Sequence, residues 1–484
     1  MTGIPCHWIP LHEASEPFIL YETPHYRKTE YDCIRLEGDP DLDRLMLAVS
    51  RAIAGFPVFR SLLRERKMDG RYLLFWEQVR HRETEIRLAD LRSSVEEGLP
   101  AREAISGHLR QRLLRGTDLE RERPVEIYLF RTAANEHYLT SVWHHAAADG
   151  VTMFEFYKRV LAHYDRLFTA SQPDWVKATF ASSSVVEKQV GKLHGYTKAR
   201  FLRESLGSAV KEARRPPARL AQKEKRTHPN RINLIRRIDP EEMKRLRKTS
   251  KRLGCSVGDL LLAVSAVAVE RWVEKEGASA DLVSVWTVTN LRDRLGVGPL
   301  AANQSSAVMI YTDPEDRRDL ARLVSMVAAE RKRQLAEGCD IANFLALIHL
   351  IRFWRRFPLR VRRGPVRRIL ERPCSFVVSN MGLLWPEMKD GHPTGRSFLE
   401  RAGNLEVMGV DYDFSVLRHI GCGFVVHTFR GWLQFNFGIL TDLMDRGEAE
   451  SFLDSYVELL RGIYDQGGRE SRSAAEAGTS FRGR

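Results

Sequence analysis

Residues 144–150 read His144-His145-Ala146-Ala147-Ala148-Asp149-Gly150, and they decide the fold expected for this 484-residue chain. Residues 137–143, just before them, have the composition of a strand. After Gly150, apolar residues recur at helical spacing, at Val151, Phe154, Val160, Leu161 and Leu167. The sequence therefore predicts a strand, a tight turn of three alanines and a helix, with the two histidines at the end of a sheet.

The side chains of His144 and His145 should face opposite ways, because side chains alternate along a strand. Only one of them can then reach a cavity and act as a base. A histidine can take a proton from a hydroxyl or amine while that group attacks a carbonyl, which is what acyl transfer needs. Asp149 is either a simple helix N-cap or a hydrogen-bonding or ion-pair partner that holds the loop.

Other chemistries fit these residues less well. No carboxylate or third histidine stands at ligand spacing on the same helix, so we expect no metal site. The chain has no Gly-x-Ser-x-Gly elbow, which disfavours a serine nucleophile. We also expect no bound cofactor.

The run from His144 to Gly150 resembles a signature shared by several acyltransferase families. They are the chloramphenicol acetyltransferases, nonribosomal peptide condensation domains, alcohol and polyketide-associated acyltransferases, and bacterial wax ester synthases. Two later segments are similar to this superfamily in the same order: residues 288–292, which end in Asn290-Leu291-Arg292 and are followed by Asn303, and residues 377–382, which contain Ser379-Asn380.

The resemblance implies an α/β fold of two chloramphenicol-acetyltransferase-like halves, each a mixed sheet flanked by helices, with an active-site tunnel between them. The chain is also long enough for two domains. We expect one half at 1–181, a basic helical linker at 182–230, the other half at 231–465 and a disordered tail at 466–484. Strands are expected at 31–36, 71–79, 125–130, 137–143, 282–289, 375–379, 419–429 and 432–437, and helices at 42–53, 240–253, 257–272 and 448–463.

The resemblance also assigns roles to single residues. The second histidine of the signature, His145, is the general base, and His144 is its non-catalytic neighbour. Asp149, followed by Gly150, points away from the substrate and pairs with an arginine, for which Arg292 is the proposed partner. Donors to the developing oxyanion are expected near Asn303, Ser379 and Asn380.

The implied reaction moves an acyl group from acyl-coenzyme A or an acyl carrier protein to an alcohol, with a lipid alcohol among the acceptors. The thioester is attacked directly, without an acyl-enzyme. One alternative is a free-standing condensation enzyme that forms an amide on an amine. Another is a catalytically silent module that docks a carrier protein or a membrane.

The net charge of +13 favours anionic partners. Nine arginines lie between Arg352 and Arg372, interleaved with apolar residues. This segment has three readings: contact with an anionic membrane, docking of an acidic carrier protein, or a solvated helix whose apolar residues face the core. Nucleic acid is disfavoured as a partner, because no motif that reads nucleic acid accompanies the charge.

No apolar run is long enough to span a bilayer and no secretory signal is evident. We therefore expect the protein in the cytoplasm, with peripheral membrane contact as an option.

Overall fold

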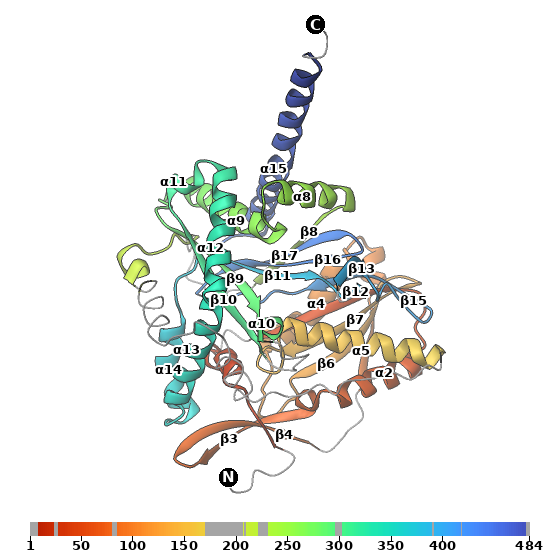
Figure 1. The fold of residues 1–484 in the computed structure, drawn as a ribbon. Helices are drawn as coiled ribbons and strands as arrows, with labels where there is room; N and C mark the ends of the chain where they lie inside the picture. The colour runs from red at the N-terminus through yellow and green to blue at the C-terminus, as the bar shows by residue number, and fades with distance from the viewer. Residues whose placement is uncertain are drawn as a thin grey trace.

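The computed structural model of the protein describes residues 8–23, 28–79, 85–169, 207, 210–220, 231–295, 303–389, 392–417 and 419–480. Within these residues the chain forms two mixed six-stranded sheets, each covered by helices (Figure 1). The predicted α/β class with two halves is confirmed.

The first sheet has the strand order β14-β15-β2-β7-β6-β5. Strand β2 runs antiparallel to β7 from the pair Thr29–His144 to the pair Glu37–Glu136, which places the histidines at one end of the sheet. Helices α2 and α5 pack on one face of this sheet and α4 on the other. The elements are β2 (Thr29–Glu37), α2 (Leu42–Ala54), β5 (Ile86–Asp90), α3 (Arg92–Glu96), α4 (Ala101–Arg115), β6 (Val125–Arg131), β7 (Glu136–His144), α5 (Gly150–Thr169), β14 (Arg401–Ala402) and β15 (Leu405–Tyr412).

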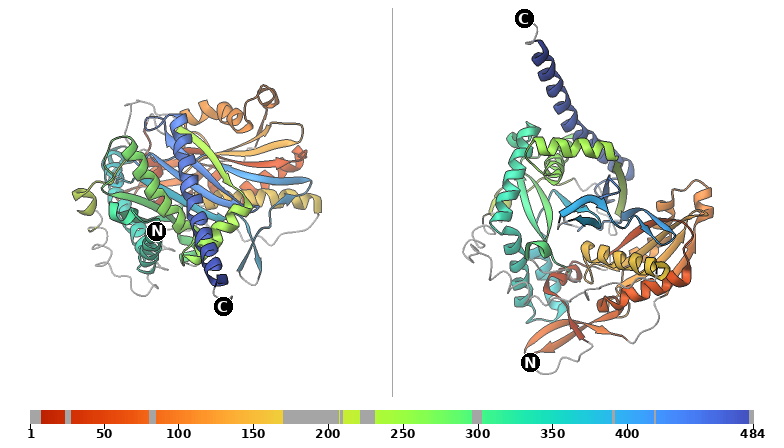
Figure 2. Two further views of the ribbon diagram at one scale, coloured as in Figure 1. Left: turned by 90° about the horizontal axis from the view of Figure 1, so that it is seen from above. Right: turned by 45° about the vertical axis from the view of Figure 1, so that its right-hand side comes forward.

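The second sheet has the order β10-β9-β11-β16-β17-β8. Its outer face carries the apolar helix α9, which begins at a capping box formed by Ser256 and Asp259 and is buried against α8, α12 and α15 (Figure 2). The elements are β8 (Arg231–Ile238), α8 (Pro240–Arg252), α9 (Val257–Lys275), β9 (Val283–Asn290), α10 (Leu291–Leu295), β10 (Ser305–Thr312), α11 (Pro314–Arg317), α12 (Leu320–Ala336), β11 (Phe376–Leu383), β16 (Cys422–Phe429), β17 (Trp432–Leu440) and α15 (Arg446–Ser480).

One strand pair crosses between the halves. Strands β14 and β15 come late in the chain, yet β15 pairs with β2 at the edge of the first sheet, from Glu406–Glu37 to Tyr412–Asp32. Residues 401–412 therefore belong to the first sheet, although they fall inside the segment 231–465 that we expected to form the second half. The expected boundary near residue 230 does not separate the two sheets.

Smaller elements surround the two sheets. Strands β1, β4 and β3 form a separate sheet, β12 and β13 form a hairpin, and α13 and α14 lie beside the short helix α1 (Figure 1). Their bounds are β1 (Trp8–Pro10), η1 (Glu13–Ser15), α1 (Pro17–Leu20), η2 (Pro57–Arg60), β3 (Ser61–Met68), β4 (Arg71–Gln78), α13 (Cys339–Trp354), α14 (Leu359–Leu370), β12 (Pro386–Lys389) and β13 (His392–Ser397).

The individual strands and helices predicted from the sequence are present, with ends shifted by a few residues. The C-terminal helix differs most: it continues to Ser480, so the stretch 466–480 is helical where we expected disorder. Most of the expected linker at 182–230 lies outside the described residues, and residues 210–214 of it are helical. No single described helix meets the length and hydropathy needed to cross a membrane, although two sharply bent helix pairs, α8 with α9 and α12 with α13, do so together.

Candidate active site

The two histidines at the end of β7 face different surroundings, as strand alternation predicts. His144 is fully buried: its Nε2 lies 3.0 Å from Glu22 Oε1, and its Nδ1 accepts a hydrogen bond from the Ala146 backbone at 3.0 Å. His145 instead lines a cavity of about 430 Å³ between the two sheets, which we call the central cavity. The histidine free to meet a substrate is therefore His145.

His145 is held in place through its ring and its main chain. Its imidazole stacks on the Phe18 ring of α1, with centroids 3.8 Å apart and an interplanar angle of 11°. Its backbone N–H donates to the Lys28 carbonyl at 3.0 Å, and its carbonyl accepts from Asn303 Nδ2 at 2.8 Å. These contacts fix the ring at the wall of the central cavity.

Burial lowers the pKa of His145 below its ordinary value, because the charged imidazolium loses its hydration. The Glu30 carboxylate opposes this shift, and the Lys28 ammonium adds to it. His145 is therefore neutral at neutral pH, which is the form that accepts a proton.

Asp149 forms the predicted ion pair with Arg292. Two parallel hydrogen bonds join them, from Nη1 to Oδ2 at 2.9 Å and from Nη2 to Oδ1 at 3.0 Å, and both side chains are buried. Asp149 also caps α5, accepting from the backbone and hydroxyl of Thr152, and accepts from the Gln304 backbone at 3.1 Å. Both readings of this residue therefore hold, as cap and as ion-pair partner.

Burial would raise the pKa of Asp149, but the Arg292 guanidinium and these hydrogen bonds hold it below its ordinary value. With its lone pairs committed to Arg292, Thr152 and Gln304, the carboxylate joins the two halves rather than relaying protons to His145.

Gly150 opens α5 at the cavity wall. A Cβ atom built there would lie 3.2 Å from the Met381 methyl carbon and 3.7 Å from the Tyr412 hydroxyl. A larger residue at this position would press on side chains that line the central cavity. The glycine of the motif thus provides space where the halves meet.

Of the residues expected near the oxyanion, the structure separates Asn303 from the other two. The carboxamide nitrogen of Asn303 donates to Ser15 Oγ and to the His145 carbonyl, both at 2.8 Å, so both of its N–H groups are used inside the protein. Asn303 is also not among the lining residues of the central cavity. The Asn303 side chain holds the His145 backbone, and an oxyanion donor near Asn303 stays a prediction.

Ser379 and Asn380 do line the central cavity, from β11 on the second sheet. The register of β11 against β16 shifts between Asn380 and Gly382. Asn380 Oδ1 accepts from the Gly382 backbone at 2.9 Å, which fixes the orientation of the carboxamide at this irregularity.

Sequence reasoning missed a buried ion pair in the same cavity. Lys28 Nζ lies 2.8 Å from Glu30 Oε1, with the two side chains 3% and 1% exposed, and both residues line the central cavity beside His145. The Tyr412 hydroxyl donates to Glu30 Oε2 at 3.2 Å. The available signal was two charged residues, two apart, just before the strand expected at 31–36.

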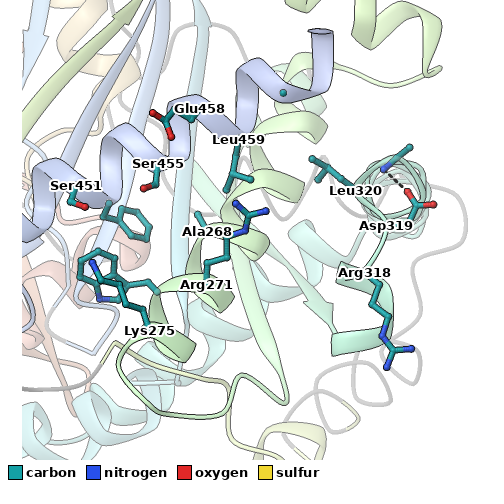
Figure 3. Close-up of a pocket in the computed structure, with 14 residues that line it drawn as sticks. Ala268, Arg271, Lys275, Arg318, Asp319, Leu320, Ser451, Ser455, Glu458 and Leu459 are labelled. Carbon is teal, nitrogen blue, oxygen red and sulfur yellow. Dashed lines mark hydrogen bonds between the residues drawn. The ribbon is translucent and has the colours of Figure 1, made fainter. Parts of the chain in front are cut away.

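A larger hollow of about 760 Å³ lies elsewhere, among α9, α15 and the start of α12 (Figure 3). It contains Arg271 and Lys275 of α9 and Glu458 of α15, and none of the predicted site residues. We place the chemistry in the smaller central cavity, because only that cavity joins a general-base candidate to residues of both sheets. Among the described residues, no group of three His, Cys, Asp or Glu side chains could hold a metal ion.

Two mixed six-stranded sheets, with His145 in the cavity between them, form the two-lobed fold of the chloramphenicol-acetyltransferase-like superfamily. Within it the chain belongs to the condensation-domain family: the family model described as Condensation domain matches residues 22–284. Members of this family transfer acyl groups and work with substrates bound to carrier proteins.

A curated relative and several solved structures are similar to this chain. CymA of Salinispora arenicola, described as a probable non-canonical nonribosomal peptide synthetase, is 23% identical over 445 residues, which are 89% of this chain and 5% of that protein. The chain thus spans about 5% of that relative's length.

Three solved structures share the fold. VibH, a nonribosomal peptide synthetase condensation enzyme, has a TM-score of 0.61 at 14% identity, covering 96% of this chain and 98% of VibH. The first condensation domain of the calcium-dependent antibiotic synthetase has a TM-score of 0.68 at 16% identity, covering 94% and 96%. The cyclization-docking bidomain of EpoB from Sorangium cellulosum has a TM-score of 0.65 at 14% identity, covering 94% and 85%.

Proposed function

We propose that this chain transfers an acyl group from a thioester, carried by coenzyme A or an acyl carrier protein, to an alcohol, with His145 as general base. One observation carries the proposal: His145 is the histidine that lines the central cavity, while Asp149 is engaged by Arg292. The thioester is a co-substrate, and the reaction needs no bound cofactor.

In the proposed reaction, the His145 imidazole takes the proton of the acceptor hydroxyl as its oxygen attacks the thioester carbonyl. Negative charge develops on the carbonyl oxygen, and we expect the Ser379 hydroxyl or the Asn380 carboxamide N–H, both of which line the central cavity, to donate to it. Collapse of the tetrahedral species breaks the C–S bond, and the leaving thiolate takes the proton from the imidazolium. The products are an ester and a free thiol, and His145 is neutral again.

An amine acceptor is the second candidate. It is favoured by membership of the condensation-domain family and by similarity to condensation enzymes of peptide synthetases. The same base and cavity serve both acceptors, because an attacking amine must also lose a proton. On this reading the product is an amide, and the donor is bound to a carrier protein.

Partners follow from the same proposal. A carrier protein or coenzyme A supplies the donor. Where the acceptor is a lipid alcohol, a peripheral contact with an anionic membrane, expected for the segment from Arg352 to Arg372, would bring the chain to it.

The test is thiol release from acyl-coenzyme A and from loaded carrier protein, with mixed alcohols or amines as acceptors. His145→Ala should lower turnover by at least a hundredfold, because general-base catalysis contributes about 10²–10⁴. His108→Ala is the matched control, since His108 is an exposed histidine of α4 that does not line the central cavity. Both variants should melt at the parent temperature.

Each outcome decides between readings. A folded His145→Ala variant with near-parent rates removes His145 as the base. Turnover by the parent with amines and carrier-bound donors alone selects the condensation reading. A parent that releases no thiol with any donor while it binds a loaded carrier selects the silent docking module.

A further inference from the structure

The segment from Arg352 to Arg372 folds into the end of α13 and all of α14, and it presents two different surfaces. The inner surface packs on α1: Ile351 and Val366 are buried against Leu20, with Trp354 and Leu359 at the edge of this small core. The reading in which the apolar residues of this segment face the core is therefore correct for about half of them.

Several of its arginines are also structural. Arg355 binds Glu13 and Glu16, and Arg362, which is fully buried, binds Glu16 at 2.7 Å. Arg352, Arg367 and Arg372 form further ion pairs with Glu13, Glu371 and Glu212. Buried or paired arginines of this kind hold α13 and α14 on the body of the protein. They do not account for the exposed arginines and exposed apolar side chains of the same segment.

The remaining side chains form an exposed face. Phe353, Phe357, Val361 and Ile369 are 53%, 43%, 50% and 50% exposed, far more than the inner residues. Residues 361, 365 and 369 of α14 are four apart, so they follow one face of that helix, and Phe357 lies in the turn between α13 and α14. We use the name α14 face for the exposed side chains of Phe353, Arg356, Phe357, Arg360, Val361, Arg368 and Ile369; Gly364 and Pro365 of this segment are exposed as well.

The charged side chains of the α14 face are all arginines, and the neighbouring acidic group is Glu65 of β3, which accepts a hydrogen bond from the Leu359 backbone. No Asp or Glu occurs from residue 352 to 370, and Arg356, Arg360 and Arg368 are all exposed. Arg356 lies over the Phe353 ring, 5.1 Å from its centroid, so cationic and aromatic groups share one surface. Figure 1 places α13 and α14 at the left-hand edge of the molecule, above the hairpin of β3 and β4.

We propose that the α14 face binds the surface of an anionic lipid membrane. Its half-exposed phenyl and aliphatic groups gain by leaving water for the boundary of the acyl chains, while its arginines pair with lipid phosphates. The face contains no Ser, Thr, Asn or Gln side chain that could make the neutral hydrogen bonds of a protein interface. This composition favours a lipid surface over an acidic protein.

The position of the face links it to the central cavity. Helix α14 contacts α1, and α1 carries Phe18, whose ring stacks on His145. A membrane on the α14 face would therefore be separated from Phe18 and His145 by α14 and α1. This inference rests on the proposed function, in which a lipid alcohol is one of the acceptors. Membrane binding itself does not require catalysis.

The test is sedimentation of the full chain with vesicles of pure phosphatidylcholine or of equal parts phosphatidylcholine and phosphatidylglycerol. We expect binding to the anionic vesicles alone, weakened by salt. Arg360→Gln with Arg368→Gln should weaken it about 30-fold, because each arginine near an anionic surface contributes about 1 kcal/mol. Phe353→Ser with Phe357→Ser should also weaken it, even at low salt.

The matched control is Arg110→Gln with Arg271→Gln, which removes the same charge from exposed arginines of α4 and α9 and should bind like the parent. Melting temperatures identify any variant that fails to fold. No binding by the parent, or equal losses in the control and the α14 variants, overturns the proposal. A second result would also overturn the proposal. If the parent does not bind vesicles, and the α14 variants lose turnover only with carrier-bound donors, then the α14 face binds a carrier protein.

The vesicle test is independent of the reaction. His145→Ala should bind vesicles like the parent if the α14 face is correct, whatever its turnover. If the proposed acyl transfer is not observed, the vesicle-binding result is unaffected. Likewise, a failure to bind vesicles does not bear on acyl transfer.

Discussion

At the scale of single residues, two buried charges, Lys28 and Glu30, lie beside His145 and bear on the proposed chemistry. Burial keeps the imidazole neutral, which suits a base before the reaction but disfavours the imidazolium that forms during it. Burial also raises the pKa of Glu30, yet the ion pair with Lys28 keeps that pKa below its ordinary value, so Glu30 remains a carboxylate. We infer that Glu30 is a positioning residue that stabilises the transient imidazolium.

Glu30→Gln tests this role through the pH profile. Removing the negative charge disfavours the imidazolium, so the pKa of His145 should fall further and the acid limb of kcat/KM should move to lower pH. The same loss should lower kcat about tenfold, or about 1.4 kcal/mol. Glu37→Gln, at the other end of β2, is the control and should leave the limb in place.

Lys28 is left buried and unpaired in Glu30→Gln, so Lys28→Met with Glu30→Gln is the second variant, in which the site carries neither charge. The Glu30 effect on the pKa of His145 exceeds that of Lys28, so the limb should again lie below the parent's. If the acid limb of the kcat/KM profile stays in place or moves to higher pH in both variants, Glu30 does not stabilise the imidazolium of His145.

The Asp149–Arg292 pair should act on stability. Asp149→Ala and Arg292→Ala should each lower the free energy of unfolding by roughly 3–5 kcal/mol, because each leaves a buried charge without its partner. The double variant should lose less than the sum. Urea unfolding at neutral pH measures these differences, and single variants as stable as the parent would show that the pair is not needed.

The pH dependence of this pair has a defined sign. The folded pKa of Asp149 is below its unfolded value, so its contribution is present above about pH 4 and is lost as the pH falls through the folded pKa. The stability difference between the parent and Asp149→Ala should therefore shrink as unfolding is measured below about pH 4.

At the scale of elements, the segment after β15 is held by glycines of the second sheet. A Cβ atom at Gly438 of β17 would collide with the Phe414 backbone oxygen, and one at Gly423 of β16 would press on the Phe414 ring as well as on Val377. Phe414 lines the central cavity. Two glycines thus let the chain run close enough to the sheet to close one wall of the site.

Gly438→Ala should therefore destabilise the protein by about 1–3 kcal/mol, because a backbone atom has no room to yield. It should also raise KM by displacing Phe414. Gly107→Ala is the matched control: nothing lies within 4 Å of a Cβ there, and Gly107 sits inside helix α4. The control should be slightly stabilising, and equal effects in both variants would refute the steric argument.

At the scale of the whole molecule, β15 makes the halves interdependent. Val407 and Val410 of this strand are fully buried in the core of the first sheet, where β15 covers the edge of β2. A fragment of residues 1–230 lacks them, so it has an open β2 edge and an incomplete core. The two halves are similar in plan, and we expect that they do not fold as separate units.

A split between residues 230 and 231 tests this. We expect the fragment 1–230 alone to show no cooperative melting and to aggregate, and co-expression with 231–484 to restore a complex that purifies together. Thermal melting and gel filtration provide the readouts. A fragment 1–230 that melts cooperatively and stays monomeric would contradict the interdependence.

The sequence by itself determined the local features. The strand, turn and helix around His144 to Gly150 depend on alternation and helical spacing within a few residues, and they are present. The opposite orientations of the two histidines followed from the same periodicity. The Asp149–Arg292 pair was also expected, but through the family resemblance, since no local rule joins residues 143 positions apart.

Only the tertiary structure decided which distant groups meet. It placed β15 in the first sheet, brought Lys28 and Glu30 beside His145, and used both amide protons of Asn303 inside the protein. It also divided the arginines from Arg352 to Arg372 into buried partners of Glu13 and Glu16 and an exposed face. Periodicity shows which side of a strand or helix a residue occupies, whereas the packing of the two sheets determines what lies opposite that side.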